Sequence, residues 1–359
     1  MSIDDLRAQI DNLDREIVAL LTRRALLARQ IGEAKDPDGP TYSAEREVQV
    51  LAKAAAASNE ALSGEALRAI YREIVSACRA LEGPFTVVYP GPKGSFTHEA
   101  ALSRFGSSVQ YAAARDIASV FTELAQRRAD YGVVPVETSM AGAVSDTLDM
   151  FLDFDETICG EIVLDIHLNL LTRSVDEDIR TIHSKPEALS QCRRWLATNY
   201  PRANLVDMAT TSAAAEMVAR TPGAAAVASR VAAELYGLTV VASAIEDNPR
   251  NRTRFLVLGH KPVGPTGRDK TTLMVSIKDE VGALAHLIAP FEQAGINLSW
   301  IESRPSRRTA WDYVFFLDMS GHTQDGPVAA VLEELRETTS FLQVLGSFPA
   351  APEGSKDRE

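Results

Sequence analysis

The first 83 residues carry an apolar pattern with helical spacing. From residue 3 onward, apolar side chains recur every three or four positions and form a narrow seam of Ile3, Leu6, Ile10, Leu13, Ile17 and Leu20. The seam predicts one long, coiled-coil-like helix over residues 3–31. The Pro/Gly-rich run at 36–40 ends this helix, and shorter helices are predicted at about 43–58 and 63–82. Because two short helices cannot cover so long a seam, we expect a dimer with intertwined long helices.

The pattern changes after residue 84 to apolar runs separated by amphipathic stretches. The runs predict strands at 85–89, 131–137, 161–171 and 255–259. Strands that alternate with helices indicate α/β layers around a largely parallel sheet. The run at 161–171 keeps its apolar face over its whole length, so it is predicted to be one long strand that could cross between two lobes.

A third pattern follows the Pro/Gly-rich linker at 261–267. It predicts a strand, a helix that ends at Gly295, a pair of hairpin strands, a helix over about 325–339 and a closing strand. This β-α-β-β-α-β order is that of ferredoxin-like α+β domains. The polar tail at 350–359 is expected to be disordered. We therefore divide the chain into an all-α domain (1–83), an α/β domain (84–260) and an α+β domain (270–348).

Composition narrows the function classes. The chain has 359 residues and a net charge of −12, which disfavours nucleic acid and anionic membranes as partners. The sequence shows no signal-peptide pattern and no apolar run long enough for a membrane span, so we expect a cytoplasmic protein. The histidines lack metal-ligand spacing, and we expect neither a metal nor another cofactor. Reduced, buried thiols are expected for Cys78, Cys159 and Cys192.

Two cations on the predicted long helix share one face. Arg24 and Lys35 are eleven residues apart, which places them on nearly the same side of a helix about 16 Å apart. A small ring with carboxylates would fit between them, with Ala28 and Gly32 as its floor. Arg7 points elsewhere and would reach only a neighbouring subunit. A solvent-exposed basic face of a dimeric helix explains the same pattern.

The segments LRAQIDNLDREIVALLTRRALLARQIGEAK (6–35) and AEREVQVL (44–51) resemble the all-helical chorismate mutases. The resemblance implies that the arginines hold the two carboxylates of chorismate in its compact conformer. It also implies that Lys35 and Glu82 stabilise the charge that develops on the breaking ether oxygen. Glu82 stands where some members have Gln and donates a hydrogen bond only when protonated. The implied catalytic residues are Arg7 of the partner subunit, Arg24, Lys35, Arg46, Glu47 and Glu82.

Polar clusters mark the predicted strand and helix ends of the α/β domain. GPKGSFTHEAA (91–101) is a Gly-rich turn before a helix, where backbone N–H groups favour anions, although an ordinary βα turn has the same composition. Glu137, Thr138 and Ser139 follow a strand. The remaining clusters are HSKPEALSQC (183–192), TTSAAA (210–215) and NRTRF (251–255).

In this order the clusters resemble the prephenate dehydratases. The resemblance implies two lobes like those of periplasmic binding proteins, with the site in the cleft between them. It implies that Thr253 assists loss of the ring hydroxyl while a carboxylate leaves as CO2. Thr138 replaces an Asn that is common in the family, so a two-donor amide is missing. The implied substrate contacts are Ser95, Phe96, Thr97, Glu137, Thr138, Ser139, Ser212, Arg254 and Phe255.

The α+β domain resembles the ACT domains of phenylalanine-sensitive enzymes through two motifs, GAL and ESRP. The resemblance implies that phenylalanine binds at a dimer interface and inhibits the dehydratase. The implied contacts are Gly282, Ala283, Leu284, Glu302, Ser303, Arg304 and Pro305. A dimerisation module without a ligand is the alternative.

The three resemblances together predict a bifunctional enzyme that converts chorismate to prephenate and prephenate to phenylpyruvate in phenylalanine biosynthesis. Two alternatives stay open. One is a ligand-responsive binding protein with an inert cleft, and the other is an enzyme that decarboxylates prephenate without dehydration. The intact Thr253-Arg254-Phe255 run and the set of mutase arginines favour the bifunctional enzyme.

Overall fold

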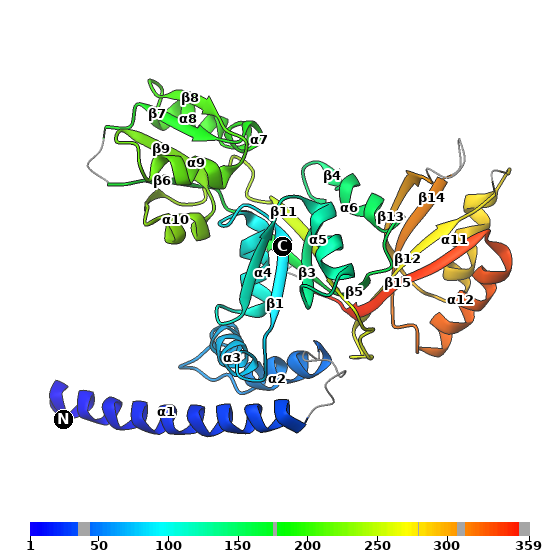
Figure 1. The fold of residues 1–359 in the computed structure, drawn as a ribbon, viewed down its shortest axis with the longest axis horizontal. Coiled ribbons are helices and arrows are strands. Elements are labelled where there is room, and N and C mark those ends of the chain that lie inside the picture. Colours follow the sequence, from blue (N-terminus) through cyan, green and yellow to red (C-terminus); the bar gives the residue numbers. More distant parts are fainter. Residues whose placement is uncertain (35–43, 175–177, 279, 307–312, 352–359) are drawn as a thin grey trace. The chain divides into compact units, whose positions relative to one another are not determined.

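The computed structural model describes residues 1–34, 44–174, 178–278, 280–306 and 313–351 (Figure 1). The chain divides into two compact units, which are residues 1–86 with 104–110, and residues 87–103 with 111–359. The predicted tail lies almost entirely outside the described residues. No helix in the described part of the chain is both long and apolar enough to cross a membrane.

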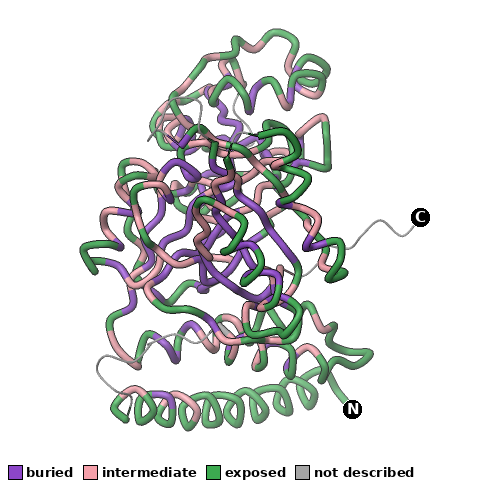
Figure 2. Tube along the Cα trace, turned by 90° about the vertical axis from the view of Figure 1, so that its right-hand side faces the viewer, coloured by how far each residue is buried: buried purple, intermediate pink, exposed green. Residues whose placement is uncertain are grey.

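The helical unit contains the three predicted helices, α1 (Ile3–Ala34), α2 (Ala44–Ala56) and α3 (Gly64–Arg79). Ser63 caps the N-terminus of α3, because its hydroxyl accepts a hydrogen bond from the N–H of Ala66 at 3.1 Å. The apolar seam of α1 stays open to solvent within one chain (Figure 2). The exposed fractions of its members lie between 45% and 69% for Ile3, Leu6, Ile10, Leu13, Ile17 and Leu20.

Residues 104–110 belong to the helical unit through contacts with α3. The Ser107 N–H and hydroxyl both donate to the Glu73 carboxylate, at 3.0 and 2.6 Å. The N–H of Ser108 donates to the hydroxyl of Ser76 at 3.1 Å. A glycine is required at position 106, where this segment approaches α3, because its φ is +75° and a Cβ there would lie 2.5 Å from the Ser76 side chain.

The first lobe of the α/β domain is built on a six-stranded sheet. Its order is β2-β1-β3-β11-β5, with the short β4 paired to β3. The strands are β1 (Thr86–Pro90), β2 (Gln110–Ala114), β3 (Tyr131–Thr138), β4 (Gly142–Ala143), β5 (Thr157–Asp165) and β11 (Arg252–Gly259). The helices of this lobe are α4 (Phe96–Phe105), α5 (Ile117–Ala125) and α6 (Ser145–Met150).

The second lobe holds a five-stranded sheet of order β10-β6-β9-β7-β8. Its strands are β6 (Asn169–Thr172), β7 (Thr181–Ser184), β8 (Asn204–Asp207), β9 (Ala224–Ala228) and β10 (Thr239–Ala242). Its helices are α7 (Pro186–Gln191), α8 (Arg193–Asn199), α9 (Thr211–Val218) and α10 (Arg230–Tyr236).

The prediction of a largely parallel sheet is wrong. β1 and β3 are parallel, but β11 runs antiparallel to both β3 and β5. In the second lobe, β7 is parallel to β8 and β9, whereas β6 is antiparallel to β9 and β10. The chain leaves the first sheet along β5 and returns to it in the opposite direction along β11. Apolar periodicity reports burial and carries no information on strand direction.

The predicted long strand at 161–171 is two strands. β5 ends at Asp165 in one sheet and β6 begins at Asn169 in the other, which confirms a crossing between lobes but not a single strand. The return segment pairs with the crossing, since the Ile166 N–H donates to the Asn251 carbonyl at 2.7 Å. Ile166 and Leu168 stay buried through the crossing, so the apolar alternation continues while the pairing partner changes.

The α+β domain follows the predicted order with β12 (Asp269–Ser276), α11 (Ala283–Gln293), β13 (Leu298–Pro305), β14 (Tyr313–Ser320), α12 (Gly326–Thr338) and β15 (Phe341–Pro349). Its sheet order is β13-β14-β12-β15 and all its pairs are antiparallel, which confirms the ferredoxin-like motif. Buried residues of this sheet, among them Met274, Phe316 and Phe348, join one apolar cluster with Val134 and Leu256 of the first lobe. The sheet of the α+β domain and the first lobe therefore share a core.

Candidate functional site

Strand β11 collects the predicted dehydratase residues. It lies between β3 and β5, with Thr253 directly opposite Thr138 on one side and Leu164 on the other. Side chains of directly opposite residues lie on the same face of a sheet with Cβ atoms about 5 Å apart. Two threonines that are distant in sequence are thus neighbours at the end of the sheet where the chain crosses between lobes.

The hydroxyl groups at this strand end have different partners. Thr138 Oγ1 accepts from the N–H of Ala141 at 3.0 Å, which leaves its own proton for donation. The Ser139 hydroxyl accepts from the Arg252 N–H at 2.9 Å and donates to the Arg250 carbonyl at 3.1 Å, so it fastens the start of β11. In the part of the chain that the structure describes, no hydrogen-bond partner is found for the Thr253 hydroxyl.

A small cavity of 190 Å³ lies beside the crossing, next to this strand end. The Asn251 side-chain amide donates to Gln191 Oε1 at 2.9 Å across it. Both residues lie inside the sequence motifs described above, Gln191 in HSKPEALSQC and Asn251 in NRTRF, but neither was predicted to be a site residue. Their positions in these motifs are the signal that could have identified them. The cavity is lined by Met140, Ser190, Gln191, Glu246, Asp247, Asn248 and Asn251.

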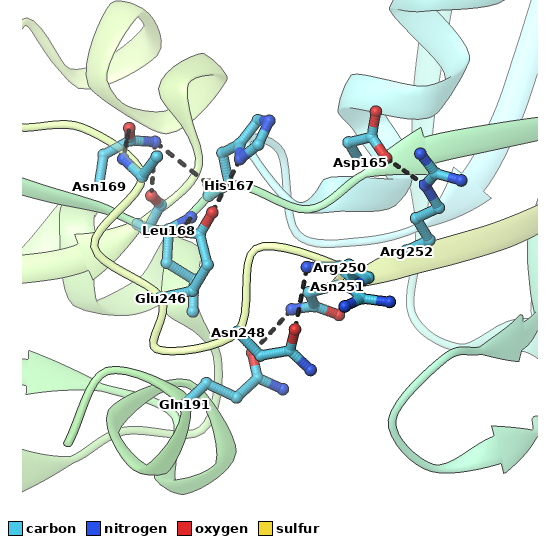
Figure 3. A network of polar contacts seen from close by, with 12 residues as sticks. Asp165, His167, Leu168, Asn169, Gln191, Glu246, Asn248, Arg250, Asn251 and Arg252 are labelled. Atoms are coloured by element: carbon cyan, nitrogen blue, oxygen red, sulfur yellow. Dashed lines mark hydrogen bonds and ion pairs between the residues drawn. The ribbon is translucent and has the colours of Figure 1, made fainter. Parts of the chain in front are cut away.

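Polar contacts tie the two crossing segments together (Figure 3). Glu246 accepts from the N–H of Leu168 at 2.9 Å and lies 2.8 Å from the His167 ring nitrogen. Further along, Arg252 Nε donates to the Asp165 carboxylate at 2.6 Å. The two segments of the crossing are thus held together by hydrogen bonds and ion pairs.

Side chains of the second lobe form hydrogen bonds with the backbone of the Gly-rich turn. The Ser212 hydroxyl donates to the carbonyl of Lys93, and the Ser229 hydroxyl donates to the carbonyl of Gly94 at 2.7 Å. Gly94 has a φ of +80°, and a Cβ there would lie 3.2 Å from the Ala232 Cα. The predicted substrate contact Ser212 therefore holds the turn against the second lobe in this structure.

The other predicted residues of the turn have structural partners too. The Ser95 hydroxyl accepts from the N–H of His98 at 3.3 Å at the start of α4. Phe96 packs against the apolar core of the second lobe, and Thr97 is 9% exposed. The structure does not bring these three side chains to the 190 Å³ cavity.

Arg254 and Phe255 also lie away from solvent. Phe255 is 1% exposed and belongs to the core. The Arg254 side chain is 10% exposed, and its guanidinium pairs with Glu161 and Asp318. The structure thus shows the Arg254 guanidinium mostly buried among carboxylates, and its predicted contact with substrate stays a prediction. Glu137 lies at the edge of the same cluster, 4.0 Å from Arg254 Nη1.

Glu99 on α4 is a buried carboxyl that the sequence analysis did not single out. Its Oε2 has no hydrogen-bond partner within the described ranges. Burial raises the pKa of Glu99 to about 7, against the opposing effect of His167. Its neutral form is therefore populated near neutral pH.

In the helical unit, the predicted mutase residues stay spread out. Arg7 is exposed and lies 3.5 Å from Asp4. Arg24 is half-buried and lies seventeen residues further along α1, about 25 Å along the helix axis. Lys35 lies outside the described residues. One chain therefore cannot bring Arg7 and Arg24 to one small ligand.

The predicted floor between Arg24 and Lys35 is filled. A Cβ on Gly32 would lie 2.9 Å from the Cα of Glu82, so the end of the third helical segment packs directly on α1. The prediction of ligand space over Gly32 is wrong for this reason. Ala28, one turn earlier, is buried by the same packing.

Arg46 and Glu47 point to different surroundings. Arg46 is exposed and its Nη1 lies 3.4 Å from Gln49 Oε1. Glu47 is 5% exposed and forms an ion pair with Arg79, with Arg104 at 4.0 Å. In this structure the Glu47 carboxylate anchors α2 to α3.

The GAL and ESRP motifs, which are predicted to bind phenylalanine, lie on separate elements. Gly282, with a φ of +87°, precedes α11, and Leu284 in its first turn is 41% exposed beside Ala283. ESRP ends β13, which is an edge strand of the sheet. Arg304 of this motif turns to α6 of the first lobe, where it donates to the Asp149 carboxylate at 3.1 and 3.2 Å. The motif is completed by Glu302, Ser303 and Pro305, of which the last two are exposed.

Comparisons with known proteins match three successive segments of the chain. Family models match successive segments: chorismate mutase type II at residues 6–83, prephenate dehydratase at 87–263 and the ACT domain at 271–337. The bifunctional chorismate mutase/prephenate dehydratase of Aquifex aeolicus is 46% identical over 355 residues, which cover 97% of this chain and 98% of that protein.

Two solved structures share the fold of the second unit. A prephenate dehydratase from Arthrobacter aurescens in complex with L-Phe has a TM-score of 0.67 and 33% identity, and the match covers 74% of this chain and 89% of that one. A protein described as a quorum-quenching acylase has a TM-score of 0.69 and 28% identity, with 74% and 98% covered. Because the Aquifex aeolicus relative is 46% identical over nearly the full length of both chains, this chain belongs to the bifunctional chorismate mutase/prephenate dehydratases.

Proposed function

We propose that this chain rearranges chorismate to prephenate with its helical unit and converts prephenate to phenylpyruvate, CO2 and water in its two-lobed region, for phenylalanine synthesis. The observation that carries the second step is the register of β11, which sets Thr253 opposite Thr138 at the strand end beside the 190 Å³ cavity. Both activities belong to the family, and the residues that perform them are the part we propose.

In the dehydratase step, Thr253 donates a hydrogen bond to the ring hydroxyl of prephenate as it leaves. The bond from the ring to its carboxylate breaks and releases CO2, and the electron pair of that bond completes the aromatic ring. The C–O bond breaks at the same time, and the departing hydroxide takes one proton from solvent to become water. An ordinary threonine is a weak acid, so its contribution is a positioned dipole at the leaving oxygen. Thr138, with its proton free for donation, supplies a second donor beside it.

In the mutase step, no group of the chain forms a bond to the substrate. Arg24 and Arg46 hold the carboxylates, and Arg7 of the partner subunit completes the clamp. The open seam of α1 supports a second copy of the chain at this position, because six apolar side chains are left 45–69% exposed. Orientation of the bound conformer then accounts for the rate.

Phenylalanine, in this proposal, binds the GAL and ESRP motifs at an interface between subunits and inhibits the dehydratase. The relative from Arthrobacter aurescens was solved with L-Phe. The exposed edge strand β13 offers a surface for the second subunit. Arg304 links the ESRP motif to α6 of the catalytic lobe, which gives the ligand a route to the site.

The test is a single assay on the purified full-length protein. Chorismate is supplied, and prephenate and phenylpyruvate are followed by their absorbance with and without phenylalanine. We expect phenylpyruvate to form and phenylalanine to stop its formation while chorismate is still consumed. Accumulation of prephenate without phenylpyruvate would overturn the dehydratase assignment, and an unchanged rate with phenylalanine would overturn the regulatory one.

A further inference from the structure

Arg254 lies where the first lobe, which we call the catalytic lobe, meets the four-stranded sheet of the α+β domain (β13-β14-β12-β15), which we call the regulatory sheet. Its Nε is 2.7 Å from the Glu161 carboxylate on β5, and its Nη2 is 2.5 Å from the Asp318 carboxylate on β14. The guanidinium carbon also lies 5.7 Å from the centre of the Trp300 ring on β13. This one side chain of the TRF motif therefore contacts β13 and β14 of the regulatory sheet and β5 of the catalytic lobe, and it lies 4.0 Å from Glu137 on β3.

The two carboxylates that bind Arg254 are themselves held in place. Asp318 is fully buried, and its Oδ1 accepts from the Thr272 hydroxyl at 2.6 Å. Glu161 accepts from Lys270 Nζ at 3.0 and 2.9 Å and from the N–H of Ala351 at 2.9 Å. The cations Arg254 and Lys270 thus face the buried carboxylates of Glu161 and Asp318, and the partly exposed Glu137 lies at the edge of the cluster. A buried pair of this kind strongly resists loss of one partner, because the other charge is then left uncompensated.

The backbone around Arg254 makes the side chain important for the position of the strand. The pairing of β11 with β3 shifts between Arg254 and Phe255, where the partner on β3 changes from Glu137 to Pro135. Proline donates no backbone hydrogen bond, and such irregularities re-aim neighbouring side chains. The ion cluster thus holds β11 at a point where its ladder with β3 is interrupted.

Successive side chains of a strand point to opposite faces of the sheet. Arg254 faces the regulatory sheet, so Thr253 faces the other way, beside Thr138. A shift of the Arg254 guanidinium would tilt the same stretch of backbone that presents the Thr253 hydroxyl. Asp318 is paired across the sheet with Trp300, which is two residues before the ESRP motif on β13.

We propose that Arg254 is a positioning residue of the dehydratase site and that its ion pair with Asp318 is the contact through which the regulatory sheet sets the position of Thr253. A change at ESRP would move β13, and Trp300 and Asp318 would pass that movement to Arg254. This inference rests on the proposed dehydratase and its inhibition by phenylalanine.

The experiment compares Asp318→Asn with Asp165→Asn in the full-length protein. Asp165 pairs with Arg252 on the same strand at 2.6 Å, but both side chains are about half exposed and neither reaches the regulatory sheet. We expect Asp318→Asn to lower the dehydratase kcat by ~10–100-fold with little change in the KM for prephenate. We also expect the half-inhibitory phenylalanine concentration to rise by ~10-fold, and Asp165→Asn to change neither quantity.

Three further measurements keep the outcome decisive. The double variant of Arg254→Gln and Asp318→Asn should lose no more kcat than Arg254→Gln alone, because Arg254→Gln already breaks the ion pair with Asp318. Thr272→Val, which removes only the hydroxyl that orients Asp318, should shift kcat in the same direction by less, and it serves if Asp318→Asn does not fold. A raised KM for prephenate in Arg254→Gln, with kcat unchanged, would return Arg254 to substrate binding and overturn the proposal. Equal behaviour of Asp318→Asn and Asp165→Asn, in a protein whose wild type is active and inhibited, would overturn it as well.

Discussion

In the two-lobed region, strand pairing sets Thr253 of β11 opposite Thr138 of β3, whereas in the helical unit Arg7 and Arg24 stay far apart on a single 32-residue helix. A sheet brings residues from distant parts of the sequence side by side, because neighbouring strands lie only about 5 Å apart. A helix spreads its residues along a line, at about 1.5 Å per residue. We propose that the first arrangement completes a site within one chain and that the second requires another chain.

The largest expected effect is loss of the dehydratase alone. Thr253→Ala removes the donor at the leaving hydroxyl and should lower the dehydratase rate by roughly 10²–10⁴-fold. Mutase activity of the same preparation should stay at the wild-type level, and it serves as the internal control. Measurement of both rates from chorismate and from prephenate separates the two sites. A comparable loss of both rates would break the comparison, because it would mean that the sites are not independent.

The next effect tests the helical side. Leu13→Glu places a charge in the middle of the α1 seam, which is harmless in a monomer because Leu13 is 57% exposed there, but costly once a second helix covers it. We expect the particle mass to fall on light scattering and mutase activity to drop by ~10–100-fold. Ala8→Glu adds the same charge at an exposed position on the opposite side of α1 from the seam and should do neither. An unchanged mass together with full mutase activity would show that one chain completes this site.

A smaller effect is expected at Thr138. Its Oγ1 accepts from the Ala141 N–H, and an Asn carbonyl could accept the same bond while its amide group supplies two donors. Thr138→Asn should therefore raise the dehydratase kcat, by up to ~10-fold. Thr138→Val keeps the shape, removes both functions of the hydroxyl and should lower kcat. A Thr138→Asn variant at or below the wild-type rate would mean that the site has adapted to threonine.

The same contrast explains what the sequence could predict. Helix limits, the order of elements in the regulatory domain and the position of the lobe crossing follow from apolar spacing, since spacing reports which side chains are buried. The break between Asp165 and Asn169 does not, because Ile166 and Leu168 remain buried while the strand changes sheets.

The roles of individual polar residues were the hardest to predict from the sequence. The TRF motif drew attention to Arg254 as a substrate contact, but its partners Glu161 and Asp318 come from strands whose packing no local pattern encodes. The hydroxyls of Ser139 and Ser212 were likewise expected to face substrate, and they bind the backbone of residues far away in the sequence. Motifs identify residues that matter, and only the tertiary contacts show which partner each one has.

The smallest expected effect concerns Glu99, a buried carboxyl of the two-lobed region that lacks a hydrogen-bond partner for Oε2 within the described residues. Burial raises its pKa from 4.5 to about 7, so the folded protein binds this proton more tightly than the unfolded chain does. The stability that this neutral carboxyl contributes is complete below pH ~4.5 and is lost as the pH rises through about 7. Glu99→Gln has no proton to lose in this range.

The measurement is the thermal midpoint of the second unit at a series of pH values from 5 to 8. We expect the wild-type midpoint to fall more steeply than that of Glu99→Gln, with a difference of a few degrees at pH 8, since ~1 kcal/mol shifts the midpoint of a domain this size by about 2–4 °C. His167 and Glu234 also act on this carboxyl, and Arg230 partly offsets Glu234. These three groups are present in both proteins, so the difference between the two curves isolates Glu99. Parallel curves would mean that Glu99 reaches solvent when it ionises. This carboxyl of the two-lobed region would then be no better shielded from water than the exposed charged side chains of α1.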